Sequence, residues 1–188
     1  MMLPDYLHSM LDEAHRLRQR FARTAPQQWT VMTAATELSV QLGHLALCML
    51  RGRGHDVSDM EDPERPITNL GDELADVVLA VLSIAVLANT VPTPLATPAA
   101  TPLNADDAFF RLLVAAGELS EAALVEHGYR HRPTGTPRPL ADAVTNVLAA
   151  CDTLATRLGI DLGDEFDAMV VSADAFLDDR LEGGDGVS

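Results

Sequence analysis

The fold is decided by two matching stretches of sequence, Gln41-Leu42-Gly43-His44-Leu45 with Glu73-Leu74-Ala75-Asp76, and Ala115-Ala116-Gly117-Glu118-Leu119 with Pro139-Leu140-Ala141-Asp142. Superposing Gly43 on Gly117 also pairs the leucines that follow, and Leu74-Ala75-Asp76 falls on Leu140-Ala141-Asp142 once the intervening loop is shortened. Internal similarity of this kind predicts two related helical pairs within one chain.

Composition favours helices over sheets in this chain of 188 residues. Alanine and leucine dominate, aromatic residues contribute only 4%, and alternating β-branched patterns do not recur. A hydrophobic content of 47% is enough for one compact domain or two closely packed halves. We therefore expect an all-α fold, a bundle of about six helices whose two halves are related by a pseudo-twofold axis.

Apolar spacing, together with glycine and proline, places the expected helices. Their ranges are 6–22, 28–51, 69–90, 105–125, 140–158 and 162–177. The third is apolar nearly all round, which predicts burial at the centre of the bundle, and Thr68 or Asn69 can cap it. The predicted organisation is a first half (1–91), a Pro-rich linker (92–104), a second half (105–180) and a disordered tail (181–188).

Net charge and the positions of the cysteines indicate which partners and which cellular compartment to expect. A formal net charge of −15 argues against a nucleic-acid polymer as partner. Cys48 and Cys151 lie in apolar helical runs without CxxC spacing, which indicates free, buried thiols in a reducing compartment. No signal-peptide pattern opens the chain, and its most apolar run, 77–88, is too short to span a bilayer. We expect a cytoplasmic protein that does not contact a membrane.

Two carboxylates stand on one face of the buried third helix. Glu73 and Asp76 are three residues apart and project the same way, and no Lys or Arg in that helix can neutralise them. A divalent cation is one counter-charge. The alternative is that both residues lie at the helix start, where the dipole favours acids and water is within reach.

A polar strip on the second helix favours the metal. Glu37, Gln41 and His44 lie at successive helical steps in an otherwise apolar segment. Facing helices that each supply oxygen ligands are a recurrent way to build a divalent site in a helical bundle. Basic residues follow both Gly-bearing helices, at Arg51 and Arg53 and in the tract 129–132. They are either cations at helix ends or loops that bind phosphate.

These motifs resemble a known family. Gly43-His44-Leu45-Ala46 with Asp72-Glu73-Leu74-Ala75-Asp76 resembles the all-α nucleoside triphosphate pyrophosphohydrolases of the MazG type, whose pattern is ExxE on one helix and ExxD on the next. In the second half, Gly117-Glu118-Leu119-Ser120-Glu121 and Leu140-Ala141-Asp142 resemble the same pair, and 158–162 resembles the turn into the last helix of that family.

The resemblance implies Mg²⁺, with Mn²⁺ as the second candidate, and hydrolysis of a nucleoside triphosphate to the monophosphate and pyrophosphate. The implied metal ligands are Glu73, Asp76, Glu118, Glu121 and Asp142. The implied catalytic residues are Glu37, Gln41 and His44. The basic residue that the family carries in its last helix is missing here, so phosphate contacts would have to come from Arg51, Arg53, Arg111, Arg130 or Arg132.

Neither half carries the whole family pattern. Gln41 and His44 stand where the first half would hold its ExxE acids, and Ala115 and Pro139 replace acids in the second. Two functions therefore stay open: a divergent pyrophosphohydrolase, or a degenerate helical protein that binds a nucleotide or a protein partner without hydrolysis. The chain is expected to act as a monomer that forms an internal pseudo-dimer, or as a homodimer.

One arrangement would restore four carboxylates. If the fourth helix packs against the third, Glu118 and Glu121 face Glu73 and Asp76 and form a composite metal site.

Overall fold

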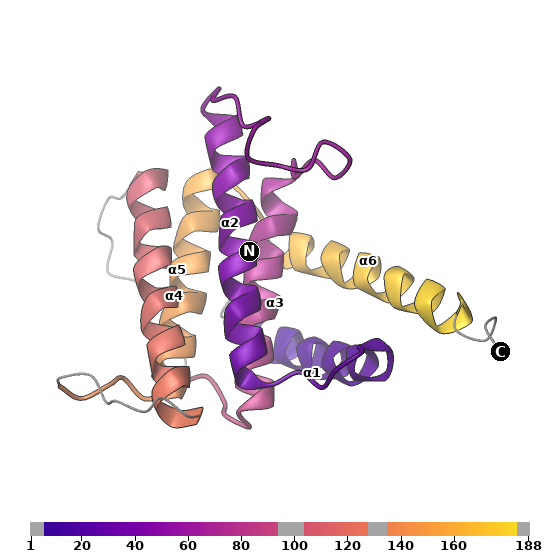
Figure 1. Ribbon diagram of the computed structural model, residues 1–188. Coiled ribbons are helices and arrows are strands. Elements are labelled where there is room, and N and C mark those ends of the chain that lie inside the picture. Colours follow the sequence, from indigo (N-terminus) through magenta and orange to yellow (C-terminus); the bar gives the residue numbers. More distant parts are fainter. Residues whose placement is uncertain (1–5, 94–103, 128–134, 184–188) are drawn as a thin grey trace.

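The computed structural model describes residues 6–93, 104–127 and 135–183, and in these ranges the chain is helical without a strand (Figure 1). Its helices are α1 (Leu7–Thr24), α2 (Val31–Gly52), α3 (Leu70–Leu87), α4 (Ala105–His127), α5 (Leu140–Leu158) and α6 (Leu162–Gly183). The all-α prediction is confirmed. None of these helices is long and apolar enough to cross a membrane.

The helix ends follow local capping chemistry. The Thr30 side chain accepts the Thr33 amide at the start of α2, and Asn69 Oδ1 accepts the Gly71 amide, 3.1 Å away, at the start of α3. The helix α5 ends at Gly159, whose φ of 70° is in the left-handed region that favours glycine. Of the two residues predicted to cap α3, Thr68 and Asn69, the structure uses Asn69.

Several helix ends differ from the expected ranges by one to three residues, and the end of α6 differs by six. The helix α3 stops at Leu87 rather than near residue 90, because Asn89 adopts a φ of 51° that a helix cannot contain. The helix α6 continues to Gly183, so the predicted disordered tail begins as helix, and residues 184–188 lie outside the described residues. Most of the predicted linker, 94–103, lies outside them as well.

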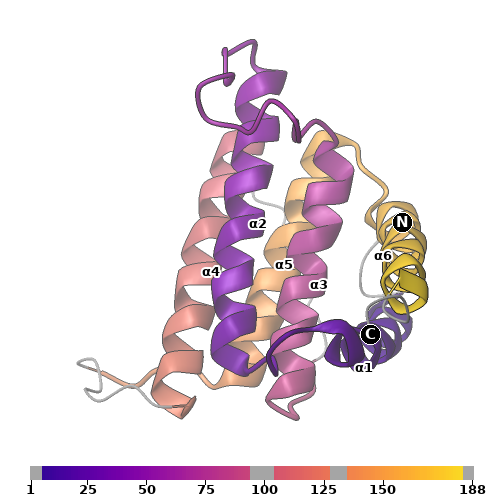
Figure 2. The same cartoon turned by 45° about the vertical axis from the view of Figure 1, so that its right-hand side comes forward.

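Four long helices form a bundle, and α1 and α6 extend from one side of it (Figures 1 and 2). The pairs α2 with α3 and α4 with α5 pack closely, as the repeat predicts, and α2 also packs on α4 while α3 packs on α5. The neighbours around the bundle thus run α2, α3, α5, α4, which places α3 and α4 on a diagonal. The symmetry that relates the two pairs stays a prediction.

The helix α3 is the central helix of the fold. It packs against α1, α2, α5 and α6, and the consecutive residues Val77, Val78 and Leu79, which point to different faces of the helix, are all buried. Each such side chain contributes roughly 1.5–3 kcal/mol when it leaves water. Any acid on α3 is therefore held in protein rather than in solvent, unless it lies near the first turn.

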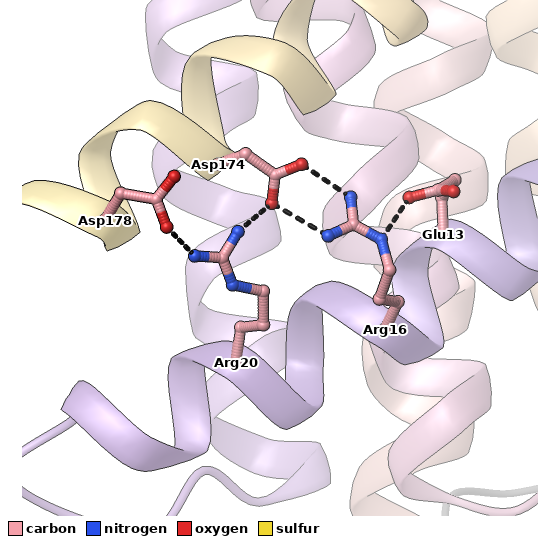
Figure 3. Close-up of polar contacts among 5 residues, drawn as sticks. All are labelled: Glu13, Arg16, Arg20, Asp174 and Asp178. Atoms are coloured by element: carbon pink, nitrogen blue, oxygen red, sulfur yellow. Dashed lines mark hydrogen bonds and ion pairs between the residues drawn. The ribbon is translucent and has the colours of Figure 1, made fainter. Parts of the chain in front are cut away.

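Ion pairs join α1 to α6 across the side of the bundle (Figure 3). Both terminal nitrogens of Arg16 donate to Asp174, each at 2.8 Å, and Arg16 Nε donates to Glu13 at 2.7 Å. Arg20 also pairs with Asp174 and with Asp178. We call this network, formed by Glu13, Arg16, Arg20, Asp174 and Asp178, the α1–α6 clamp.

Candidate functional site

The two carboxylates of α3 lie in its first two turns, facing the protein. Glu73 is only 7% exposed, and Asp76 is partly buried. Burial, followed by the neighbouring carboxylate of Asp72, raises the pKa of Glu73 to about 7. Burial and the carboxylates of Asp72, Glu73 and Glu37 raise the pKa of Asp76 to about 7. Both acids are therefore poorly solvated and repelled by like charge.

The polar strip of α2 lies against these carboxylates. Gln41 Nε2 donates to Glu37 Oε1 at 2.9 Å, and His44 Nδ1 lies 3.3 Å from Glu73 Oε2 without the alignment of a hydrogen bond. Since Glu37 also raises the pKa of Asp76, the structure brings all five predicted residues of the first half together. We call Glu37, Gln41, His44, Glu73 and Asp76 the first-half site.

Buried polar atoms without partners gather at this site. In the described part of the chain, the buried side-chain atoms that lack a hydrogen-bond partner are Nε and Nη1 of Arg18, Oε1 of Gln41 and Oε2 of Glu73. They come from α1, α2 and α3, and Glu37 influences Arg18 electrostatically. Buried polar groups are almost always paired, so the unmet acceptor atoms of Gln41 and Glu73 are typical of a place that holds a ligand.

The donor chemistry of the first-half site fits a divalent cation. Carboxylate oxygens suit Mg²⁺ and Mn²⁺, and an imidazole suits Mn²⁺ in addition. Glu73 Oε2 accepts no hydrogen bond although its side chain is 91% buried, and the nearby His44 leaves room for a further positive partner such as a metal ion. Across the residues that the structure describes, however, no group of three or more His, Cys, Asp or Glu side chains already converges on one point. Side-chain rotation would have to complete the coordination.

The predicted phosphate-binding arginines of the first half are engaged elsewhere. Arg51 donates to the backbone carbonyl of Ile67 and pairs with Glu61, which fastens the loop between α2 and α3. Arg53 pairs with Asp106 at the start of α4.

The remaining predicted arginines do not add to the first-half site. Arg111 is exposed on α4. Arg130 and Arg132 lie outside the described residues.

In the second half, the predicted metal ligands do not join Glu73 and Asp76. Glu118 pairs with Arg138, at 3.2 Å, and Glu121 is exposed on α4. Since α3 and α4 are diagonal in the bundle, the composite site proposed from chain adjacency is not formed.

The second half replaces acids with cations at matched positions. Asp142 on α5 occupies the position of Asp76 and is partly buried. The register that superposes Gly43 on Gly117 puts Arg111 at the position of Glu37, and the register of α3 on α5 puts Arg138 at that of Asp72. The second half therefore pairs Glu118 with Arg138, whereas at the matched position of the first half His44 lies 3.3 Å from Glu73. Extending the repeat by a few residues would have revealed this from the sequence.

Two cations near the first-half site were missed by the sequence reasoning. Arg18 on α1 lies between the rings of Phe21 and Trp29, with its guanidinium carbon 4.6 and 4.3 Å from their centroids. Arg65, in the loop before α3, lowers the pKa of both Glu73 and Asp76. No motif marks either arginine, because both reach the site only through the packing of α1 and the course of a loop.

Comparisons of the chain with models of protein families, with curated proteins and with solved structures gave no match. The resemblance to the MazG type therefore rests on the motifs themselves.

Proposed function

We propose that the chain is a metal-dependent nucleoside triphosphate pyrophosphohydrolase whose active site is the first-half site. The observation that carries this proposal is the buried Glu73 carboxylate, whose Oε2 accepts no hydrogen bond and lies near Asp76, His44 and Glu37. It supports a bound divalent cation, and the choice of reaction follows from the resemblance of the surrounding motifs. The cation is Mg²⁺ or Mn²⁺, and it would neutralise phosphate charge and activate water.

The residues of the chain divide the remaining tasks. Glu37, Glu73 and Asp76 supply the oxygen ligands, and Gln41 holds Glu37 in place through its hydrogen bond. Arg65, whose charge lowers the pKa of Glu73 and of Asp76, would attract the phosphate chain to these carboxylates. In the reaction, the oxygen of water bonds to the α-phosphorus and the bond to the bridging oxygen breaks. Pyrophosphate leaves, and His44 accepts the proton from water.

The second candidate is a nucleotide-binding protein that does not hydrolyse its ligand. It is favoured by Gln41 and His44, which supply no anionic oxygen where the family pattern has two acids. Binding and hydrolysis must therefore be measured separately.

The test is pyrophosphate release by the full chain, incubated with each ribo- and deoxyribonucleoside triphosphate and with Mg²⁺ or Mn²⁺. Hydrolysis of at least one nucleotide is expected, and Asp76→Asn should reduce it roughly a hundredfold or more, because the variant loses an anionic metal ligand. The matched control is Asp164→Asn, which removes an exposed acid from the first turn of α6. It should retain the activity.

The outcomes separate the two candidates. Silence across all nucleotides with both metals rules out hydrolysis, and nucleotide binding in calorimetry would then establish the second candidate. Activity that Asp76→Asn leaves intact would place the chemistry outside the first-half site.

A further inference from the structure

Arg18 is enclosed in a way that its own packing does not explain. Its guanidinium lies between the Phe21 and Trp29 rings, and Nε and Nη1 are buried without a hydrogen-bond partner. The aromatic faces attract the charge, but they do not replace the hydrogen bonds that these N–H groups had in water. Burial accordingly lowers the pKa of Arg18 to about 10.

Two other arginines of α1 provide the contrast. Arg16 and Arg20 lie two residues to either side of Arg18, and both pair with carboxylates of α6 in the α1–α6 clamp (Figure 3). Arg18 points instead toward the side of α1 where Trp29 leads into α2. A buried charge without a partner is usually less stable than an apolar side chain of similar volume. An acceptor from outside the chain would supply the hydrogen bonds that Arg18 lacks.

The surroundings indicate the charge of that acceptor. Glu37 of the first-half site raises the pKa of Arg18, so the guanidinium lies within electrostatic range of the Glu37 carboxylate. A ligand that carries a cation toward Glu73 and negative oxygens toward Arg18 would satisfy both sets of unpaired atoms. Metal-bound phosphates have this distribution of charge.

We propose that Arg18 is a phosphate-binding residue, held between Phe21 and Trp29 until the phosphate of a ligand accepts its N–H groups. The assignment of that phosphate to a nucleoside triphosphate rests on the proposed function. Phosphate binding itself does not require hydrolysis.

The experiment uses inorganic pyrophosphate as the probe, with and without Mn²⁺, and Trp29 as the reporter. Trp29 is the only tryptophan of the chain, so a displacement of the guanidinium that covers it should change its fluorescence. Wild-type protein should show a saturable change, confirmed by calorimetry. Arg18→Met should weaken pyrophosphate binding by roughly tenfold or more, as expected for the loss of charge-assisted hydrogen bonds.

The melting temperature distinguishes a phosphate-binding role of Arg18 from a structural role. Arg18→Met should keep or raise the melting temperature, because methionine fills similar space without an unpaired charge. The matched control is Arg20→Met, which breaks the α1–α6 clamp and should lower the melting temperature while leaving pyrophosphate affinity unchanged. If Arg18→Met instead melts as low as Arg20→Met and binds pyrophosphate like wild type, Arg18 is a packing residue and the inference is wrong.

Two further ligands identify which part of a nucleotide causes the change in Trp29 fluorescence. A nucleoside triphosphate should give the same change as pyrophosphate, whereas the corresponding nucleoside should give none, and an equal response to the nucleoside would overturn the phosphate assignment. A failure of hydrolysis leaves this result intact. If wild-type protein hydrolyses nucleotides but does not bind pyrophosphate, the phosphate-binding role of Arg18 is wrong while the proposed function stands.

Discussion

Glu73 is the residue in which stability and function oppose each other most directly. Its carboxylate is 7% exposed, and burial raises its pKa from 4.5 to about 7. The folded state therefore binds a proton more tightly than the unfolded state, and stability declines as the pH rises through the interval between these values. Without a metal, the ionised carboxylate is a destabilising group at neutral pH.

This decline of stability with rising pH leads to a first prediction, which concerns Glu73→Gln in metal-free buffer. At about pH 8 the variant should be more stable than wild type by roughly 1–3 kcal/mol, and the difference should vanish near pH 4, where both states of wild type are protonated. Urea unfolding at several pH values in the presence of a chelator measures it. A pH-independent difference would mean that Glu73 does not titrate in this interval.

The two cysteines give a second prediction. Both are free and buried, and burial raises the pKa of Cys48 to about 11 and raises that of Cys151 as well. Because the thiolate is the reactive form, neither thiol should react with Ellman's reagent in the native protein within the time that the unfolded chain needs for completion. Rapid release of one equivalent from native protein would show that a thiol is accessible.

Most of the first-half site could be predicted from the sequence, because helical spacing alone puts Glu73 beside Asp76 and Glu37 in line with His44. The prediction needed no knowledge of distant contacts. Arg18 could not be predicted, since its role depends on how α1 approaches Trp29. The engagement of Arg51 by the carbonyl of Ile67 depends in the same way on the path of a loop.

Helix ends were predictable where a residue with a local stop signal is present. The expected range of α5 agrees with the structure, because Leu140 follows Pro139 and Gly159 ends the helix. The end of α6 was placed too early, since no glycine or proline precedes Gly183 within that helix beyond Gly163. The helix instead continues past Leu177 to Gly183 and packs against α1.

The contact between α1 and α6 gives a third prediction. Hydrogen bonds from Arg16, and then from Arg20, lower the pKa of Asp174, so its contribution to stability is present above its ordinary value of 3.8 and is lost as the pH falls below it. Asp174→Asn should therefore destabilise the protein by about 1 kcal/mol at neutral pH and by less in acid.

A double-mutant cycle with Arg16→Met checks the physical cause. The coupling between Arg16 and Asp174 should shrink at high salt, because their side chains are 39% and 30% exposed and are therefore partly screened. A coupling of zero at low salt would mean that the ion pair adds nothing to stability.

At the level of the whole molecule, the sequence predicted the pairs α2 with α3 and α4 with α5 but not the order of helices around the bundle. The order α2, α3, α5, α4 follows from contacts between the pairs, and the repeat alone gives no information on which helix lies across the diagonal. For this reason the predicted composite site, which requires α4 beside α3, is not formed.

The different halves lead to a fourth prediction, that one chain binds one metal ion. The second half offers Arg111 and Arg138 at the positions of acids in the first, and Glu118 already pairs with Arg138. Titration with Mn²⁺ in a calorimeter should give a single site that Asp76→Asn weakens and Glu118→Gln leaves unchanged. Two equivalent sites, or a site weakened by Glu118→Gln, would show that the second half takes part.

The α1–α6 clamp has a consequence for how the chain is made. Arg16 and Asp174 are separated by 158 residues, so on the ribosome α1 emerges well before its partner exists. The nascent chain can assemble α1 to α5, with α1 packed on α3, while Arg16 and Arg20 remain solvated, and the clamp can form only once α6 has been synthesised. Residues of the clamp should accordingly have low φ-values, with Asp174→Asn accelerating unfolding far more than it slows refolding.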